Sequence, residues 1–448
     1  MIKNLFKNKE FNNASWLIFG RVIQLVLSLF VSILTARYLG PSNKGLIDYA
    51  SAYVLFFTAF CVLGLNSVLV KDFIDKPEER GLAIGSALVM RLVSSVLSAI
   101  MIILISTIVD YGETETIIVV ALCSLGTIFN VFETFNFWFQ AQYKSRVTSI
   151  VMLIAYAVMS AYRVVLLVLG KDVYWFALAT SVEYAVVAIA LYVAYKIYHG
   201  PKLRFSFKKC KQLLKSSYHF ILPSLMIAIY NQVDKIMLKN MVDTVEVGYY
   251  STAVTLTHVW GFVLTAMIDS IVPTILRLKN QDENAYKKKN MQLYSMVFYT
   301  AIFVAVLYTI FGDLVIEILY GEEFMGASMP LKILPWLTAF SYLGGARSAW
   351  VVSENKQKYL KYINVTAVFT NVILNLVLIP FLGASGAAIA SLVTQMCVCI
   401  IVPLMIKPMR ENAILMIRAI NPKYIFSAIK SLFKKNKNNP ANDNGEEK

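Results

Sequence analysis

Long apolar runs separated by short polar segments dominate the hydropathy pattern of this 448-residue chain. A helix needs about 20 apolar residues to cross the hydrocarbon core of a bilayer, and twelve runs meet that length. They lie near residues 16–38, 46–69, 84–109, 116–138, 147–169, 173–195, 217–239, 247–270, 291–313, 330–352, 359–381 and 386–408. The pattern predicts an all-α polytopic membrane protein with twelve transmembrane helices.

Two loop motifs occur twice in the chain, which indicates an internal duplication. The segment 39–50 matches 242–253 in its first apolar residue, its glycine and its final alanine, at an offset of 203 residues. The segment 138–146 matches 350–358 in one tryptophan and two basic residues, at an offset of 212. Six spans separate the copies, so the halves are parallel repeats related by an axis along the membrane normal. Repeats of this kind predict two pseudo-symmetric six-helix lobes around a cavity that alternates between inward and outward openings.

The predicted organisation has five parts. The N-lobe with spans 1–6 covers 1–195, a basic cytoplasmic linker covers 196–216, and the C-lobe with spans 7–12 covers 217–408. Apolar and basic residues then alternate at helical spacing, which predicts an interfacial amphipathic helix within 409–433. The segment 434–448 is almost free of apolar residues and is expected to be disordered.

The distribution of charge predicts the orientation. Of 42 Lys and Arg residues, 32 fall in segments that are cytoplasmic if the N-terminus is inside, four fall in outer loops and six lie within spans. This positive-inside bias predicts that both termini are cytoplasmic, and it explains the net charge of +15 without a nucleic-acid partner. The five cysteines are scattered without a CxxC motif, so we expect free thiols and no metal site.

Four arginines lie inside predicted spans: Arg21, Arg91, Arg163 and Arg347. A guanidinium stays charged, and placing one in hydrocarbon costs at least about 2.5–3.5 kcal/mol. For any single arginine, a structural ion pair or a snorkelling side chain is an adequate explanation. For all four together, we favour a water-filled cavity that binds an anion, with Arg163 alone in the outer half of its span.

Polar residues at helical spacing accompany these charges. The stripe of span 1 continues from Arg21 through Gln24, Ser28 and Ser32, and span 8 carries His258 on a similar stripe. Four acidic residues lie within spans as partners for the cations: Glu133, Glu183, Asp234 and Asp269. Asp234 and Lys235 are neighbours that point about 100° apart on a helix, so we expect each to have another partner. Asp234, Lys235, Asp269 and Glu133 are candidates for ion pairs or for ion coupling.

Several of these motifs resemble those of a known family. The segments 36–41, 233–238, 247–253, 371–375 and 379–388 are similar to motifs of the bacterial polysaccharide-unit flippases, which serve O-antigen, capsule and exopolysaccharide synthesis. That family belongs to the multidrug/oligosaccharidyl-lipid/polysaccharide exporter superfamily, and the resemblance extends from about residue 10 to 408.

The resemblance implies a function and its partners. It implies translocation of oligosaccharide units on undecaprenyl pyrophosphate across the bacterial cytoplasmic membrane, without enzymatic chemistry and without a bound cofactor. Membrane lipids, a glycan polymerase and chain-length proteins are the partners it suggests. Guanidinium groups suit a pyrophosphate, which agrees with the four arginines. Coupling to a proton or sodium gradient also follows from the resemblance, and no residue of this sequence establishes it.

Three alternatives stay open at this point. A drug or cation antiporter of the same superfamily would need an acidic cavity centre. An integral-membrane glycan polymerase or ligase usually carries catalytic residues on a large outer loop, whereas the longest outer loop here covers about residues 312–330. A passive scaffold or channel would not need charged stripes on some helices of a duplicated fold. His199, His219 and His258 are too scattered in the sequence to form a catalytic constellation.

Overall fold

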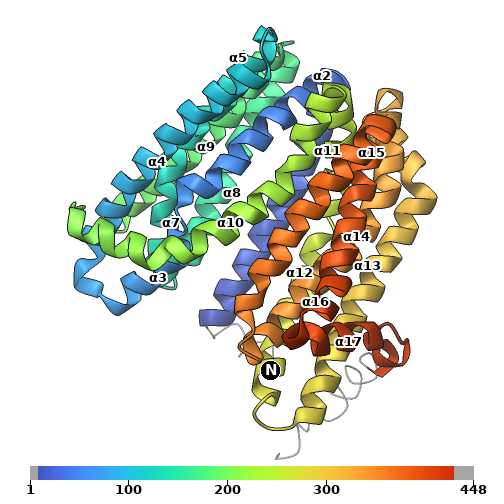
Figure 1. Cartoon of the computed structure of the whole chain (residues 1–448). Coiled ribbons are helices and arrows are strands. Elements are labelled where there is room, and N and C mark those ends of the chain that lie inside the picture. Colours follow the sequence, from blue (N-terminus) through green and yellow to red (C-terminus); the bar gives the residue numbers. More distant parts are fainter. Residues whose placement is uncertain (1–8, 428–448) are drawn as a thin grey trace, which may run out of the picture. The chain divides into compact units, whose positions relative to one another are not determined.

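The computed structural model describes the backbone of residues 9–427 and the side chains of residues 23–427. Within that range the chain is almost entirely helical and contains no strand (Figure 1). The main helices are α2 (Lys9–Val62), α3 (Leu65–Asp75), α4 (Arg80–Val109), α5 (Thr114–Ser124), α6 (Gly126–Phe129), α7 (Thr134–Ala141), α8 (Ser145–Val168), α9 (Val173–Ile197), α10 (Phe207–Met241), α11 (Thr244–His258), α12 (Gly261–Leu278), α13 (Glu283–Tyr320), α14 (Ser328–Ser353), α15 (Leu360–Met396), α16 (Val402–Met405) and α17 (Arg410–Ala419). Short 3₁₀ segments are η1 (Pro77–Glu79), η2 (Asn130–Glu133), η3 (Glu322–Ala327), η4 (Gln357–Tyr359) and η6 (Lys407–Met409), and η5 (Cys397–Ile401) is a π-helix.

All twelve predicted spans coincide with helices. Eight helical stretches among the described residues are long and apolar enough to cross a membrane. Two of them, Ile23–Asp75 and Gln357–Met405, are 53 and 49 residues long and contain a break at Gly40 and at Gly383. Both glycines have positive φ angles, 71° and 52°, which a residue with a Cβ rarely adopts. Each of these two stretches therefore supplies two spans, and the more polar helices α10 and α14 supply the remaining two.

The chain divides into two compact units. Unit 1 consists of Met1–Thr252, Val315–Ala327 and Asn375–Ala384, and unit 2 consists of Ala253–Leu314, Ser328–Leu374 and Ser385–Lys448. Helix α10 thus packs with the helices that precede it in the chain. The boundaries proposed above for the two lobes stay a prediction.

A polar side chain forms long-range hydrogen bonds with the backbone near each of these two glycines, within unit 1. The Glu246 carboxylate accepts a hydrogen bond from the N–H of Ala384 at 2.5 Å, directly after Gly383. The Arg37 guanidinium, close to Gly40, donates to the carbonyls of Ile318 and Leu319 at 2.5 and 2.8 Å, at the end of α13. A carboxylate at a helix N-terminus and a guanidinium at a C-terminus also suit the helix dipole.

The apolar core of unit 1 lies where α3, α4, α7, α9 and α10 meet. Phe73, Phe135, Trp138 and Tyr195 are buried there, and the rings of Phe135 and Tyr195 have centroids 4.4 Å apart. The segment between α9 and α10 runs along the first turns of α4, where the N–H of Arg204 donates to a backbone carbonyl at 3.0 Å. The basic linker is therefore packed against the helices of unit 1 from Pro201 onward.

The same type of helix cap occurs in both copies of the second repeated sequence motif. Tyr143 and Asn355 are 212 residues apart, and both are left-handed with φ angles of 56° and 53°. In both places the following lysine donates its N–H to the carbonyl five residues before it, at 2.9 Å, as in a Schellman cap. Trp138 and Trp350 are both buried in the helix that precedes the cap. The offset that suggested a duplication in the sequence thus also relates two identical backbone conformations.

The other repeated motif forms a contact between its own two copies, within unit 1. A Cβ atom on Gly45 would lie 1.7 Å from the carbonyl oxygen of Thr244, and one on Gly248 would lie 2.2 Å from the carbonyl oxygen of Pro41. Gly45 and Gly248 are repeat mates at the offset of 203, and so are Pro41 and Thr244. The hydroxyls of Ser42 and Thr244 share a hydrogen bond of 3.0 Å beside them. We call this reciprocal contact the glycine seam.

We predict that Gly45→Ala and Gly248→Ala each destabilise the protein by about 1–3 kcal/mol, because backbone carbonyls cannot yield to the added methyl group. The measurement is the thermal unfolding midpoint of the purified protein in detergent. Gly344→Ala is the control, since a Cβ there meets nothing within 4 Å. Equal midpoints for the seam variants and the control would contradict close packing at the seam.

Candidate functional site

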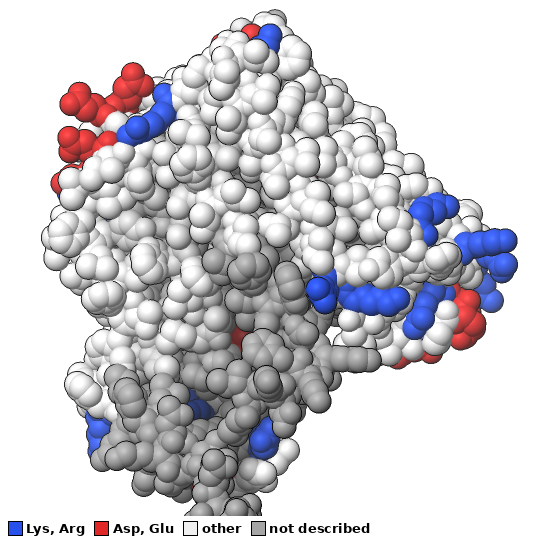
Figure 2. Space-filling view, turned by 180° about the vertical axis from the view of Figure 1, so that it is seen from behind, with Lys and Arg blue, Asp and Glu red and all other residues white. Residues whose placement is uncertain are grey.

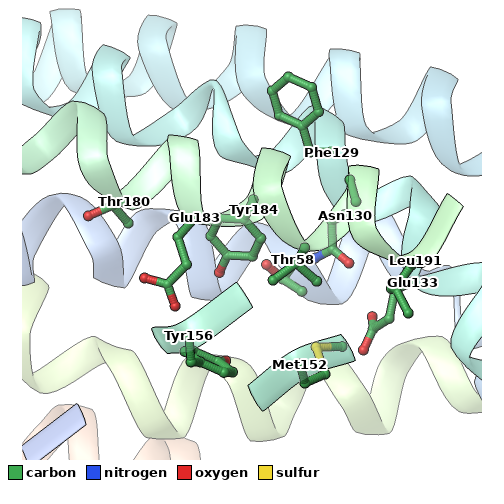
Figure 3. A pocket seen from close by; sticks show the side chains of 12 residues that line it. Thr58, Phe129, Asn130, Glu133, Met152, Tyr156, Thr180, Glu183, Tyr184 and Leu191 are labelled. Atoms are coloured by element: carbon green, nitrogen blue, oxygen red, sulfur yellow. The ribbon is translucent and has the colours of Figure 1, made fainter. Parts of the chain in front are cut away.

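A cavity of about 360 Å³ lies within unit 1, between the second half of α2, the α6–η2 region, α8 and α9. Its polar lining consists of carboxylate, amide and hydroxyl groups, and its apolar lining includes one phenylalanine and one methionine. Figure 3 shows Tyr156 and Met152 across the cavity from Thr180, Glu183 and Tyr184. The lining residues are Thr58, Phe129, Asn130, Glu133, Met152, Tyr156, Thr180, Glu183, Tyr184, Val187, Ala188 and Leu191.

A break in the fourth span shapes one wall of this cavity. The helix stops after Ser124, resumes at Gly126 and narrows to the 3₁₀ segment η2, which carries Asn130 and Glu133. Ser181 on α9 repairs the break: its Oγ accepts from the N–H of Gly126 at 2.7 Å and lies 2.5 Å from the carbonyl oxygen of Leu122. Irregular backbone at membrane depth is tolerated where the protein satisfies it or where it lines a cavity. Asn130 and Glu133 line the cavity from the 3₁₀ segment that follows the break.

Arg163 and Glu183 form an ion pair at the cavity. The Arg163 guanidinium donates to the Glu183 carboxylate at 2.6 Å, and the two side chains are 26% and 20% exposed. Tyr156 lies in the electrostatic range of both and within hydrogen-bonding reach of Gln24. Arg163 therefore has the acidic partner that its position in a span requires.

Arg91 lies behind the other cavity glutamate. Its side chain is 1% exposed, and it donates to Asn66 at 2.6 Å and to Thr134 at 3.3 Å. The guanidinium also lies 5.4 Å from the centre of the Phe137 ring. Glu133 is the carboxylate that interacts with it electrostatically. Arg91 is not among the lining residues of the cavity, and its charge acts there on the carboxylate of Glu133.

Arg347 lies in unit 2 and is 3% exposed. Its nitrogens bond to the side chain of Asn412 at 3.1 Å, to the carbonyl of Val398 at 3.4 Å and to the carbonyl of Cys399. Val398 and Cys399 belong to the π-helix η5, whose carbonyls are displaced from the regular ladder. In this conformation Arg347 connects η5 to α17.

Asp234 is part of a second buried cluster in unit 1. Its carboxylate accepts from the amide of Asn375 at 2.6 Å and from the hydroxyl of Tyr250. Lys235, on the adjacent face of α10, interacts electrostatically with the ion pair of Lys44 and Asp48. Lys235 also lies in the electrostatic range of Asp234, so separate partners for these two neighbours stay a prediction.

The remaining predicted residues lie elsewhere or face outward. Ser28 is exposed, and Gln24 and Ser32 are half-buried on α2. His258 and Asp269 are exposed positions of unit 2. The side chain of Arg21 lies outside the described residues, as does the chain after residue 427, which includes the end of the predicted interfacial helix and the predicted tail.

Within unit 1, the structure therefore brings together Gln24, Glu133 and Arg163, with Arg91 in electrostatic range of Glu133, whereas Asp234 and Lys235 belong to a second cluster of that unit. The sequence indicated Glu183 only as an acid available to pair with the cations. It did not indicate Asn66, Asn130 or Tyr184. An asparagine inside an apolar span is a usable signal for the first two, because an amide in hydrocarbon needs a partner.

We predict that Ser181→Ala destabilises the protein by about 1–3 kcal/mol, because the N–H of Gly126 and two carbonyls would lose their partner in a dry environment. Thermal unfolding in detergent measures the effect. Ser270→Ala is the matched control, since that hydroxyl is exposed and bonds only within its own helix. A change no larger than that of the control would contradict the proposed repair.

A double-mutant cycle on Arg163→Met and Glu183→Gln tests the ion pair. Each single change leaves one charge without its partner, so we predict a favourable coupling energy of about 1–3 kcal/mol. The unfolding midpoints of the two single variants and the double variant give this value. Additive effects would show that the pair does not stabilise this conformation.

The chain is similar in sequence to one protein family and to one curated protein. The family described as "Polysaccharide biosynthesis protein" matches residues 11–279. A probable low-salt glycan biosynthesis flippase, Agl15 of Haloferax volcanii, is 25% identical over 189 residues, which are 42% of this chain and 40% of that protein. The chain therefore matches two fifths of the length of this curated relative.

Solved membrane transporters share the fold. An inward-facing multidrug resistance MATE family transporter of the MOP superfamily has a TM-score of 0.65 at 15% identity, with 92% of this chain and 96% of that chain covered. The lipid II flippase MurJ, inward closed, has a TM-score of 0.64 at 14% identity, with 94% and 99% covered. A MOP superfamily transporter from Pyrococcus furiosus has a TM-score of 0.62 at 12% identity, with 93% and 97% covered. These likenesses confirm the predicted exporter fold of a multi-pass membrane protein.

Proposed function

The chain belongs to the polysaccharide biosynthesis protein family, and on this premise we propose that it is a flippase for lipid-linked oligosaccharide units. It would carry units attached to undecaprenyl pyrophosphate across the bacterial cytoplasmic membrane by alternating access, for synthesis of O-antigen, capsule or exopolysaccharide. It acts as a transporter and makes or breaks no covalent bond. Both termini lie in the cytoplasm in this proposal.

The composition of the cavity lining is the observation that supports this proposal most strongly. Carboxylates of Glu133 and Glu183 and the amide of Asn130 accept hydrogen bonds, which sugar hydroxyls donate. Rings of Tyr156 and Tyr184 offer flat apolar surface beside these acceptors. A few convergent polar groups in a partly apolar cavity are typical of small-molecule sites. We assign this cavity to the sugars of the substrate.

The arginines take different parts in this proposal. Arg163, about one quarter exposed, is accessible to an anion once it releases Glu183, and Arg21 is the corresponding candidate on span 1. Arg91 and Arg347 are more than nine-tenths buried, so contact with pyrophosphate would require them to leave their present partners. We therefore propose direct contact for Arg163 and Arg21, and contact in another conformation for Arg91 and Arg347.

Restoration of surface polysaccharide in a flippase-deficient bacterial host tests the proposal, at matched levels of protein in the membrane. We expect Glu133→Gln, Glu183→Gln and Arg163→Ala each to reduce polysaccharide at least about tenfold, the loss that corresponds to 1.4 kcal/mol of transition-state stabilisation. Arg163→Lys should retain partial function if charge alone is required. The control is Glu317→Gln, an exposed carboxylate on α13 outside the cavity lining.

Full activity of all three cavity variants would overturn the assignment of the cavity. Failure of the unmodified chain to support any lipid-linked glycan, across hosts with different polysaccharides, would overturn the flippase proposal itself.

Ion coupling is a further part of the proposal. Asp234, Lys235, Asp269 and Glu133 are its candidates, and Asp234 is the one with the most complete set of polar neighbours. A buried carboxylate held by an amide and a hydroxyl can exchange a proton or a cation when the helices that hold it separate. Dissipating the proton and the sodium gradients separately, while transport is followed in vesicles, distinguishes the two ions.

A drug or cation antiporter is the second candidate, because the cavity lining carries two glutamates and no arginine. Such a protein would raise the resistance of a pump-deficient host to cationic drugs, and Glu183→Gln would abolish that resistance. Resistance without glycan transport would favour this candidate over the flippase.

A further inference from the structure

A second hollow in unit 1 lies between α3 and the start of α10, and it differs in chemistry from the cavity described above. Its volume is about 590 Å³. It is open to the surface and lies where charge predicts the cytoplasmic edge of the membrane, because α3 ends there and the span within α10 begins there. The lining residues are Ser67, Val68, Lys71, Asp72, Asp75, Lys76, Gln212, Leu213, Lys215, Ser216 and Phe220.

Contacts at two points hold this hollow open between the helices. At one end Gly64 packs so closely on α10 that a Cβ would lie 2.8 Å from the carbonyl oxygen of Ser217. At the other end the buried Lys209 lies 2.9 Å from Asp72 and 2.7 Å from Glu79. These two contacts fix the spacing of α3 and α10 at both ends of the hollow.

The hollow has an excess of available positive charge. Lys209 is shared between Asp72 and Glu79, and its hydrogen bond lowers the pKa of the Glu79 carboxyl, so this group of three keeps one net negative charge. Lys71, Lys76 and Lys215 are exposed and form no ion pair with any residue that the structure describes. The three lysines outnumber the two negative charges that remain, one of Asp75 and one shared by Asp72 and Glu79. Figure 2 shows basic side chains gathered at this end of unit 1, around the α3–α4 turn and the start of α10.

The hollow is amphipathic as well as basic. Hydroxyl and amide groups of Ser67, Ser216 and Gln212 lie among the lysines, and Leu213 and Phe220 provide its apolar wall. Phe220 is 50% exposed, and it lies where the apolar part of α10 enters the predicted membrane. A ligand that fits would carry a phosphate with an acyl chain attached, since ammonium and hydroxyl donors bind the phosphate and the apolar wall continues into the bilayer.

We propose that this hollow binds the head group of an anionic phospholipid of the inner leaflet. The phosphate lies between Lys71, Lys76 and Lys215, and the acyl chains pass along Phe220 into the membrane. Bound lipid contacts both α3 and α10 and so stabilises the packing of α10 in unit 1. The inference does not rest on the proposed function, because it concerns another hollow and another ligand.

Native mass spectrometry of the full chain in detergent, titrated with phosphatidylglycerol or phosphatidylcholine, tests the proposal. We expect wild-type protein to retain phosphatidylglycerol in preference, and the triple variant Lys71→Gln, Lys76→Gln, Lys215→Gln to bind it at least about tenfold more weakly. The matched control changes Lys202, Lys208 and Lys211 to Gln, which removes the same charge from exposed positions outside the lining. The control should change the affinity by less than about threefold if the three lysines of the hollow form a specific site.

A second variant keeps the charge and fills the space. Ser216→Trp is an exposed substitution on α10, and we expect it to displace phosphatidylglycerol while leaving the unfolding midpoint without lipid unchanged. Equal weakening by the triple variant and its control would overturn the proposal in favour of diffuse surface attraction. So would unaltered binding to Ser216→Trp.

Two competitors identify the source of the phosphate. Millimolar inorganic phosphate should displace little lipid, and complete displacement would show a site for free phosphate. Farnesyl pyrophosphate should compete no better than phosphatidylglycerol itself. Stronger competition that disappears in the triple variant would reassign the hollow to a polyprenyl pyrophosphate and overturn the phospholipid proposal.

Discussion

The hydrocarbon environment allows no unsatisfied backbone, and this constraint explains where the polar residues of the spans lie. Each break in a helix exposes N–H or carbonyl groups, and at four breaks or helix ends a particular side chain meets them. Within the predicted spans, Ser181 meets the break in the fourth span and Arg347 the π-helix η5. At the predicted outer surface, Glu246 meets the break after Gly383 and Arg37 the end of α13. Some polar residues that the sequence suggests as lining of a transport pathway instead form hydrogen bonds to the backbone of irregular helices.

This constraint divides the charged residues into two classes. Arg347 is committed to carbonyls and Arg91 to neutral side chains beneath Glu133. Arg163 differs because its partner, Glu183, lines a cavity and both are partly exposed. A pair in contact with solvent or substrate can be exchanged for another partner at a modest energetic cost, whereas a buried guanidinium cannot. Arg163, which the sequence places apart from the other three arginines, is therefore the one among the described guanidinium groups whose partner lines the cavity.

The sequence is sufficient for the spans and for the repeat, because apolar length and loop spacing are local properties. The helix breaks at Gly40 and Gly383 are predictable for the same reason, since a glycine between two spans predicts a turn. The cavity could not be predicted in this way, because its wall contains a 3₁₀ segment at Asn130 and follows a helix break whose backbone is satisfied by Ser181, more than 50 residues away. The burial of Arg347 likewise depends on α17, a helix whose packing no local pattern specifies. The cavity wall and the burial of Arg347 depend on contacts between residues far apart in the chain, which hydrophobic periodicity cannot predict.

The glycine seam carries one more implication, about the history of the fold. In this contact the glycine of each repeat packs against the residue that, in the other repeat, lies four positions before the equivalent glycine. A reciprocal contact of this kind is isologous, as between two identical subunits related by a two-fold axis. Gly45 against Thr244 and Gly248 against Pro41 satisfy that relation inside a single chain. Two copies of a six-helix protein with this one surface would form the same contact across a two-fold axis, so the seam has the geometry of a dimer interface inside one chain.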